Sequence, residues 1–348
     1  MRVVITGASG NVGTSVLRSF ADEPAVDSVV GIARRVPKAT FPKTDWVAAD
    51  VRHADLVPLF EGADAVIHLA WLIQPSRDLA TVRETNVKGS ERVFQAVGDA
   101  GVPTLLYASS IGAYSPGPKD RAVDEGWPTE GIPTNFYSRH KAEVERLLDR
   151  FELASPAVRV VRLRKALIFK REAASGVRRL FMGPFVPTSL MKPERIPAIP
   201  KLRGVRFQCV HSFDVGEAYR LALTRDVRGP FNIAADPVLD FDTVAKLLEA
   251  RAIPVPIPLV RKAAEVSWKL RLQPTPPGWV DLAVRSPVMD WSRARNELGW
   301  IPQFTSEQAL LDLLAGLHDR DGLPTPPLSP KTSGPVRIRE IRTGVGGR

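Results

Sequence analysis

The chain has 348 residues, of which 44% are hydrophobic and 25% charged, and its formal net charge is +10. This composition is typical of a globular protein long enough for one large α/β domain or slightly more. It has no apolar run of about eighteen residues that would span a membrane, and its first residues, MRVVITGASG, lack the apolar segment of a signal peptide. Its single cysteine, Cys209, excludes an internal disulfide and a cysteine-based zinc site. We therefore expect a cytoplasmic protein without a metal.

The positive charge makes nucleic acid a candidate partner, because basic surfaces bind phosphate. The basic residues, however, neither form one long block nor alternate with aromatic residues that could stack on bases. They concentrate at Arg34 and Arg35, between Arg159 and Arg179, and near the C-terminus. We expect no nucleic-acid partner, no membrane partner and a small molecule as the substrate.

Short apolar runs alternate with helical patterns through the first half of the chain. The run RVVIT precedes the glycine turn TGASGNVG, and a helix is expected over residues 12–20. Further strands are expected at VDSVVGIA, WVAAD, ADAVIHLA, TLLYASS and VRVVRLRKALIF, with helices between several of them. Each run is nearly continuous in apolar residues, which is typical of strands covered on both faces. The pattern predicts an α/β fold with a Rossmann-type, doubly wound parallel sheet.

The pattern changes near residue 165, and we expect a smaller C-terminal substrate lobe. Residues 1–165 would form the Rossmann domain, with residues 205–228 returning to it as a strand and a helix. Residues 166–204 and 229–318 would form the substrate-binding lobe, in which IPVPIPLVRKAAEVSWKLRL is expected to be an amphipathic helix. Residues 319–348 are rich in proline, glycine and charge, so we expect a disordered basic tail.

The glycine turn predicts a dinucleotide site. Gly7, Gly10 and Gly13 lie directly between a strand and a helix, where a pyrophosphate can approach the backbone and the helix N-terminus favours negative charge. The spacing G-x-x-G-x-x-G is weak by itself, but the strand before it and the helix after it supply the required context.

The end of the second strand indicates which nicotinamide cofactor binds. An acidic residue there usually holds the ribose hydroxyl of NAD, whereas an arginine accommodates the additional phosphate of NADP. Here the strand ends with Ala33, followed by Arg34 and Arg35. The sequence therefore favours NADP, with NAD as the alternative if the two arginines are only solvated. Asp50, at the end of the third strand, is placed to meet the adenine.

The segment FYSRHK contains a candidate catalytic pair. Tyr137 and Lys141 are four residues apart on an expected helix, so both side chains project from one face. Hydride transfer at a secondary alcohol or ketone requires a group that exchanges the proton of the oxygen. A neighbouring ammonium is expected to lower the pKa of a phenol toward the range where acid–base catalysis is efficient.

Together these motifs resemble the extended short-chain dehydrogenases/reductases, the NAD-dependent epimerase/dehydratase family. The resemblance covers residues 1 to about 317 and rests on TGASGNVG, AADV, HLA, TNVKG, YASSIGAY, YSRHK, HSFDVGEA and ELGW. It implies a catalytic set of Ser110, Tyr137, Lys141 and Asn86, in which Ser110 binds the substrate oxygen and Ser109 lies beside the cofactor. The cofactor-binding residues expected from the motifs are Gly7, Ser9, Gly10, Asn11, Val12, Gly13, Arg34, Arg35, Asp50, Val51, Leu69, Ala70, Ser109, Tyr137 and Lys141.

We expect net oxidoreduction at a secondary alcohol or ketone. One alternative is a nucleotide-sugar epimerase, such as one similar to UDP-glucose 4-epimerase, whose cofactor is not consumed. Another is a non-catalytic, NADP-sensing binding protein, although such proteins typically lose the tyrosine or the lysine that are both present here. Pairs of helices in this family often form dimers, so a homodimer is also a candidate.

The sequence departs from the family pattern after the strand VVRL. The family's L-R-P-x-x-x-x-G reads LRKALIFK here, so Lys165 and Lys170 replace the proline and the glycine, and no asparagine is present to hold a nucleotide-sugar diphosphate. The basic residues of this region either line a cationic substrate pocket or form a solvated face; they are Arg162, Arg164, Lys165, Lys170, Arg171, Arg178 and Arg179. The apolar group Trp71, Leu72 and Ile73 either lines a pocket for an apolar substrate or packs under a loop.

Overall fold

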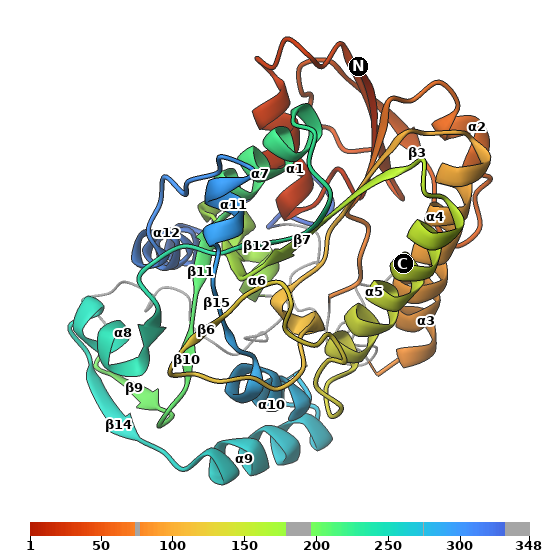
Figure 1. Cartoon of the computed structure of the whole chain (residues 1–348). Coiled ribbons are helices and arrows are strands. Elements are labelled where there is room, and N and C mark those ends of the chain that lie inside the picture. The colour runs from red at the N-terminus through yellow and green to blue at the C-terminus, as the bar shows by residue number, and fades with distance from the viewer. Residues whose placement is uncertain (74–76, 179–195, 274, 331–348) are drawn as a thin grey trace.

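A seven-stranded parallel sheet forms the centre of the molecule (Figure 1). The computed structural model describes residues 1–348 apart from 74–76, 179–195, 274 and 331–348. The strand order is β12-β7-β5-β4-β1-β2-β3, and each neighbouring pair is parallel. The strands are β1 (Arg2–Thr6), β2 (Ser28–Ala33), β3 (Thr44–Ala48), β4 (Ala65–His68), β5 (Thr104–Tyr107), β7 (Arg159–Lys165) and β12 (Gly229–Ile233). This confirms the predicted Rossmann-type, doubly wound α/β fold.

Helices cover both faces of the sheet, as the continuous apolar runs predict. Val3 and Ile5 of β1 join one core with α1 (Asn11–Phe20) and α7 (Ser212–Thr224). Val4, between them, faces the other core, with α2 (Val57–Phe60), α4 (Gly89–Asp99) and α5 (Phe136–Ala154). Because successive side chains of a strand point to opposite faces, neighbouring residues of β1 contribute alternately to the two cores.

Short helices connect these layers. They are α3 (Leu79–Arg83), the π-helical turn η1 (Glu84–Lys88), and the 3-10 turns η2 (Ile111–Ala113) and η3 (Arg171–Ala173). The turn η1 runs directly into α4, so the chain changes helical type between Lys88 and Gly89.

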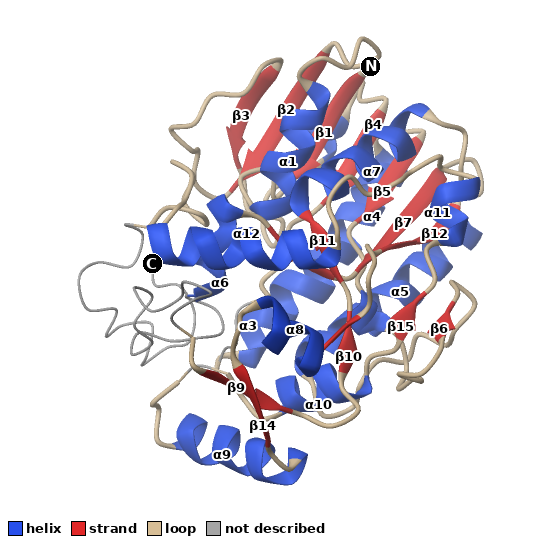
Figure 2. Ribbon diagram, turned by 90° about the vertical axis from the view of Figure 1, so that its left-hand side faces the viewer, coloured by secondary structure: helices blue, strands red, loops and turns tan. Residues whose placement is uncertain are grey.

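The second lobe consists of short strand pairs and helices at the carboxyl end of the sheet. Its strand pairs are β8 (Leu167–Phe169) with β11 (Cys209–His211), β9 (Ala198–Lys201) with β14 (Arg251–Pro254), β10 (Arg206–Phe207) with β13 (Leu239–Asp240), and β6 (Ala122–Val123) with β15 (Val288–Met289). Its helices are α6 (Ala174–Val177), α8 (Phe241–Leu247), α9 (Ile257–Lys269), α10 (Gly278–Arg285), α11 (Ser292–Asn296) and α12 (Ser306–Asp319). Figure 2 shows β9, β14 and α9 at the end of the molecule opposite the N-terminus. Within the described part of the chain, no helix has the length and apolar character needed to cross a membrane.

Two predicted boundaries need correction. The strand β12, assigned to the substrate lobe with residues 229–318, pairs with β7 and forms the edge of the large sheet. The expected disordered tail begins too early at residue 319, because Thr325 and Leu328 are buried and Asp321 pairs with Arg171. Residues 331–348 of that tail lie outside the described residues.

Candidate active site

The glycine turn after β1 is shaped by close backbone contacts. Gly7 has φ +75°, and a Cβ there would lie 2.6 Å from the backbone nitrogen of Ala70 in the turn after β4. A Cβ at Gly13 would lie 2.4 Å from the carbonyl oxygen of Ala8. Gly10 is the N-cap of α1 in an extended conformation. These contacts hold the start of α1 against the sheet, and its free N–H groups form a cradle that suits a pyrophosphate.

The other predicted residues of the turn lie around this cradle. Ser9 is buried, and Asn11 donates from Nδ2 to the carbonyl of Ile168 at 3.4 Å. The Asn11 Oδ1 atom is buried with no hydrogen-bond partner among the described residues. Leu69 extends β4, its N–H donating to the Thr6 carbonyl at 2.9 Å, and so brings Ala70 over Gly7. The residues present therefore fit a dinucleotide.

The adenine end of the predicted site contains an additional cation. Arg34 and Arg35 follow β2 and are exposed. The carboxylate of Asp50 accepts from Nη2 of Arg52 at 2.8 Å and from its backbone N–H at 3.0 Å. Partial burial favours a higher pKa for Asp50, but the Arg52 hydrogen bonds outweigh it and the pKa is lowered. Asp50 is thus held by Arg52, a residue that the sequence reasoning missed. Val51, between them, is buried against Gly89 at the start of α4.

Tyr137 lies in the first turn of α5, which begins where Asn135 caps the helix by accepting from the Ser138 N–H at 2.9 Å. The phenol is 8% exposed and packs between two indoles. Trp279 of α10 stacks on it with ring centroids 5.5 Å apart, and Trp71 meets it edge-on at 6.0 Å. No sequence signal links residue 279 to this helix, so Trp279 was not predicted.

Lys141 and Ser110 converge on the same place. Nζ of Lys141 donates to the Ala108 carbonyl at 2.5 Å and lies 3.4 Å from the centre of the Trp71 ring, the ring that also contacts Tyr137. The hydroxyl of Ser110 accepts from the Gly112 N–H at 3.0 Å, and the Tyr137 ring lies over Gly112, where a Cβ would be 2.7 Å from the ring and 3.5 Å from Oγ of Ser110. The three predicted residues therefore lie together beyond the carboxyl end of β5, beside the first turns of α5.

The pKa of the phenol does not follow the expectation from the sequence. Burial raises the pKa of Tyr137 to about 12, with the Ser110 hydrogen bond acting in the opposite direction. Burial and the nearby charge of Lys165 place the pKa of Lys141 well below its usual value. Removal from water thus dominates the pKa of the phenol, because a buried phenolate loses its solvation.

Residues 3–234, more than half of the chain, match the model of the NAD dependent epimerase/dehydratase family. The chain belongs to this family. An uncharacterised protein of Mycobacterium tuberculosis is 27% identical over 326 residues, covering 93% of this chain and 31% of that protein. The chain thus spans about a third of the length of that relative. A Stigmatella aurantiaca protein is 24% identical over 326 residues, covering 89% of this chain and 95% of its own. It is named a 4-hydroxy-2-methyl-3-oxo-4-farnesyl-3,4-dihydroquinoline-1-oxide ketoreductase.

Solved structures show the same fold. The UDP-glucose 4-epimerase of Thermotoga maritima has a TM-score of 0.69 at 18% identity, covering 92% of this chain and 99% of its own. The UDP-glucuronic acid 4-epimerase of Bacillus cereus, solved with NAD, has a TM-score of 0.68 at 16% identity, covering 92% and 99%. The predicted family and fold are therefore confirmed.

Asn86, the fourth catalytic residue that the family resemblance implies, has both ends of its amide bound to one residue. Oδ1 accepts from the Leu72 N–H at 2.7 Å, and Nδ2 donates to the Leu72 carbonyl at 3.0 Å. Asn86 therefore fixes the loop after β4, which carries Trp71 toward Tyr137. In this structure it supports the apolar wall around Tyr137.

Ser109 and two of the basic residues meet at a buried carboxylate. Glu145, one turn after Lys141 on α5, accepts from Ser109, from Nη1 of Arg162 at 2.9 Å and from Nη2 of Arg164 at 3.0 Å. The arginines are therefore neither a cationic substrate pocket nor a solvated face. The four-residue spacing of Tyr137, Lys141 and Glu145 is the signal that could have identified this carboxylate.

The lysines that depart from the family pattern are also buried. Nζ of Lys165 donates to the Tyr219 hydroxyl at 3.0 Å, and burial lowers the pKa of Lys165 to about 7. Lys170 lies against α1. Arg171 forms ion pairs with Asp319 and Asp321 at the surface. Arg179 lies outside the described residues.

The apolar group predicted beyond HLA belongs to the wall around Tyr137. Leu72, Val82, Phe136 and Tyr137 form one buried cluster, against which the partly buried Trp71, Ile73, Trp279 and Leu282 pack. Tyr137 is the polar group at the centre of this cluster.

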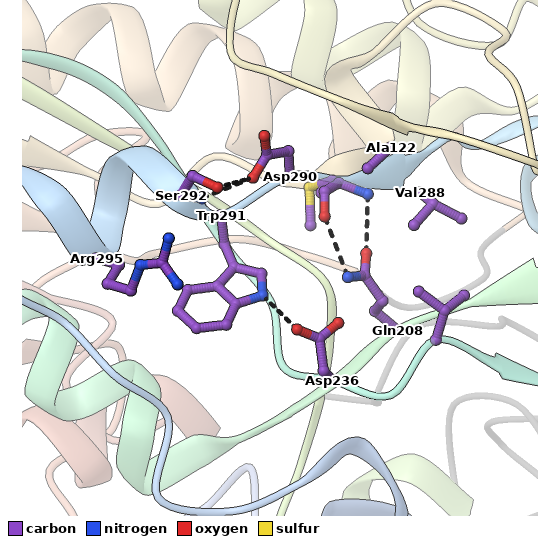
Figure 3. A pocket seen from close by; sticks show the side chains of 10 residues that line it. Ala122, Gln208, Asp236, Val288, Asp290, Trp291, Ser292 and Arg295 are labelled. Carbon is purple, nitrogen blue, oxygen red and sulfur yellow. Dashed lines mark hydrogen bonds between the residues drawn. The ribbon is translucent and has the colours of Figure 1, made fainter.

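A separate pocket of about 240 Å³ lies beside β15 (Figure 3). Its polar side chains bind one another or the backbone: Trp291 donates to Asp236 at 3.0 Å, and Gln208 bonds both backbone groups of Met289. None of the predicted catalytic or cofactor residues lines it. Among the described residues, no group of three His, Cys, Asp or Glu side chains could hold a metal.

Proposed function

We propose that the protein is an NAD(P)-dependent oxidoreductase that transfers a hydride at a secondary alcohol or ketone of an apolar small molecule. The observation that carries the proposal is the convergence of Ser110 and Lys141 on Tyr137, inside an apolar wall and next to the glycine turn. The presence of all three side chains argues against a non-catalytic sensor.

The chain's own residues suit the direction of ketone reduction. When bound, the reduced cofactor supplies the hydride to the carbonyl carbon. Tyr137 donates its phenolic proton to the carbonyl oxygen, and a pKa of about 12 keeps this proton in place at neutral pH. Ser110 orients the phenol and is placed to donate to the same oxygen. Water then returns a proton to the phenolate, which the nearby Lys141 stabilises when charged.

The surroundings of Tyr137 favour an apolar substrate over a nucleotide sugar. Two indoles and the side chains of Leu72 and Phe136 pack around the phenol. The arginines that could have held a diphosphate are engaged by Glu145. The farnesylated ketone in the name of the Stigmatella relative supports the same substrate class.

We further propose NADP as the preferred cofactor. Arg34 and Arg35 are exposed where a 2′-phosphate would lie, and Arg52 adds a third cation beside Asp50. The test is a titration of the protein and of Arg34→Asp with NADPH and with NADH, followed by nicotinamide fluorescence. We expect NADPH to bind more tightly, and the variant to lose that preference. Tighter binding of NADH would contradict the preference for NADP. If the protein bound neither nucleotide, the proposal that it is an NAD(P)-dependent enzyme would be wrong.

Tyr137→Phe tests the chemistry. We expect the rate of carbonyl reduction to fall by about 10²- to 10⁴-fold, with the dissociation constant of NADPH within about twofold of the native value. The substrates are a panel of apolar ketones, and NADPH consumption is measured against alcohol formed. One NADPH per alcohol supports net reduction. A product isomer formed without cofactor consumption would instead establish epimerisation.

A further inference from the structure

Lys170 places a buried ammonium beside the first turn of α1. The side chain is 1% exposed, and its Nζ donates to the Asn11 carbonyl at 3.1 Å, to Oγ1 of Thr14 at 2.8 Å and to Oγ of Ser15 at 2.9 Å. All three acceptors are neutral groups of the helix that follows the glycine turn. The ammonium is therefore solvated by the helix but not neutralised.

No carboxylate of the described residues forms an ion pair with Lys170. The charges that act on it are Glu172, which favours the ammonium, and Arg18 on α1, which opposes it. On α7, which packs against α1, the ring of Phe213 lies 5.6 Å from Nζ. The carboxylate of Asp214 on the same helix is bound to the backbone N–H groups of Gln303 and Phe304 instead.

The remaining nearby carboxylate is also engaged elsewhere. Asp312 of α12 accepts from the backbone N–H of Arg171 at 2.9 Å and from the ring of His211 at 3.1 Å. Lys170 thus adds positive charge next to a helix N-terminus, which is itself positive, in a place where water does not screen it. Such an arrangement is unfavourable until an anion arrives.

We propose that Lys170 supports cofactor binding, its ammonium balancing the pyrophosphate charge through the first turn of α1, to which its three N–H groups are bound. The inference rests on the proposed use of a nicotinamide cofactor and names a charge that the glycine turn does not predict. The Asn11 side chain also binds the carbonyl of Ile168, two residues before Lys170, so the segment carrying Lys170 is tied to the turn. The family pattern has glycine at this position, so the charge is a feature of this chain.

The affinity of the protein for a pyrophosphate should depend on pH. Burial lowers the pKa of Lys170 to about 8. An anion bound nearby favours the ammonium and raises that pKa. Binding therefore takes up a proton near pH 8. Below that pH the charge of Lys170 makes its full contribution to the affinity. This contribution is lost as the pH rises through the higher pKa that Lys170 has in the complex.

The test compares ligands that contain different phosphates. ADP-ribose carries the pyrophosphate without nicotinamide, whereas 2′-AMP carries the ribose phosphate without a pyrophosphate. Dissociation constants of NADPH, ADP-ribose and 2′-AMP are measured by calorimetry or thermal shift for the native protein and for Lys170→Met. We expect the variant to weaken ADP-ribose and NADPH by about tenfold, the effect of a charge attraction of about 1.4 kcal/mol, and to leave 2′-AMP unchanged.

Lys119→Met is the matched control. Burial lowers the pKa of Lys119 to about 8 as well, but its Nζ binds the carbonyls of Arg206 and Ala283 in the other lobe. We expect no change in any of the three affinities. Native affinity of Lys170→Met for ADP-ribose, or equal weakening of all three ligands, overturns the inference.

A measurement on the native protein covers the case in which Lys170→Met does not fold. Its affinity for ADP-ribose should fall between pH 7 and pH 9, with proton uptake at pH 8 detected by calorimetry in buffers of different ionisation enthalpy. A pH-independent affinity overturns the inference while the proposed function stands. Binding of neither NADPH nor NADH to the native protein overturns both.

Discussion

Trp279 of α10 stacks on Tyr137 of α5 with ring centroids 5.5 Å apart, so the C-terminal lobe covers the phenol at the centre of the candidate site. Trp71 closes the other side, and the loop that carries it is held by Asn86. The apolar wall therefore has one part from each lobe. A substrate that reaches the phenol must contact or displace Trp279.

We expect Trp279→Ala to act mainly on substrate binding. An aromatic stacking contact contributes about 0.5–1.5 kcal/mol, and we expect the substrate to lose a contact of this size in the free energy of binding. KM for an apolar ketone should therefore rise by up to about tenfold, with kcat nearly unchanged. The pKa of Tyr137 should fall toward its usual value, because water reaches the phenol. Steady-state kinetics and the ultraviolet titration of tyrosine measure the two effects.

Trp268→Ala is the control for this change. Trp268 lies on α9, where the Arg77 guanidinium covers its ring at 4.3 Å from the centroid, and it makes no ring contact with Tyr137 among the described residues. Replacing Trp268 should leave KM within about twofold of the native value. A loss of kcat in Trp279→Ala with KM unchanged would contradict the proposed substrate contact.

Glu145→Gln should destabilise the protein strongly. Although burial alone would raise it, the hydrogen bonds and charges of Arg164 and Arg162 lower the pKa of Glu145 to about 2. The neutral amide leaves the buried Arg164 without its carboxylate, whereas Arg162 keeps Asp149 and Glu152. We expect a loss of about 3–5 kcal/mol in the free energy of unfolding, because a buried charge loses its partner. Urea denaturation at pH 7 measures it.

Glu91→Gln is the corresponding surface variant. Glu91 pairs with Lys88 at 2.8 Å, and both side chains are partly exposed, so its loss should cost no more than about 1 kcal/mol. Equal effects of the two substitutions would show that the Glu145 network contributes no more than an exposed ion pair.

The parts of the molecule that the sequence predicts are those fixed by local spacing. The glycine turn, the doubly wound sheet and the common face of Tyr137 and Lys141 follow from residue patterns within one or two elements. The contact of both side chains with Trp71 agrees with that face. Glu145 continues the same spacing, but its partners come from β7, so its role depends on how the helix packs on the sheet.

Long-range packing explains what the sequence did not predict. Trp279 reaches Tyr137 from a helix more than a hundred residues away, and β12 joins the large sheet after the chain has passed through the second lobe. The raised pKa of Tyr137 is likewise a consequence of burial by both lobes. A charge pattern could not separate the buried Arg162 from the solvated face of the alternative interpretation, since only the fold places Glu145 beside it.

Lys165→Met should stabilise the protein more at pH 7 than at pH 9. Burial lowers the pKa of Lys165 from 10.5 to about 7, so between these values the unfolded chain binds more protons and stability rises with pH. Methionine removes this dependence. The difference in unfolding free energy between variant and native protein should therefore grow by up to about 1.4 kcal/mol per unit as the pH falls from 9 to 7.

The lost hydrogen bond to Tyr219 subtracts a constant of about 1–3 kcal/mol, so the slope of the difference, and not its sign at one pH, carries the prediction. Urea denaturation at pH 7, 8 and 9 measures that slope. Lys88→Met, which changes a partly exposed lysine paired with Glu91, should show none. A difference that stays constant over this range would mean that Lys165 is charged in the folded protein throughout, with its buried ammonium held by Tyr219 and its surroundings.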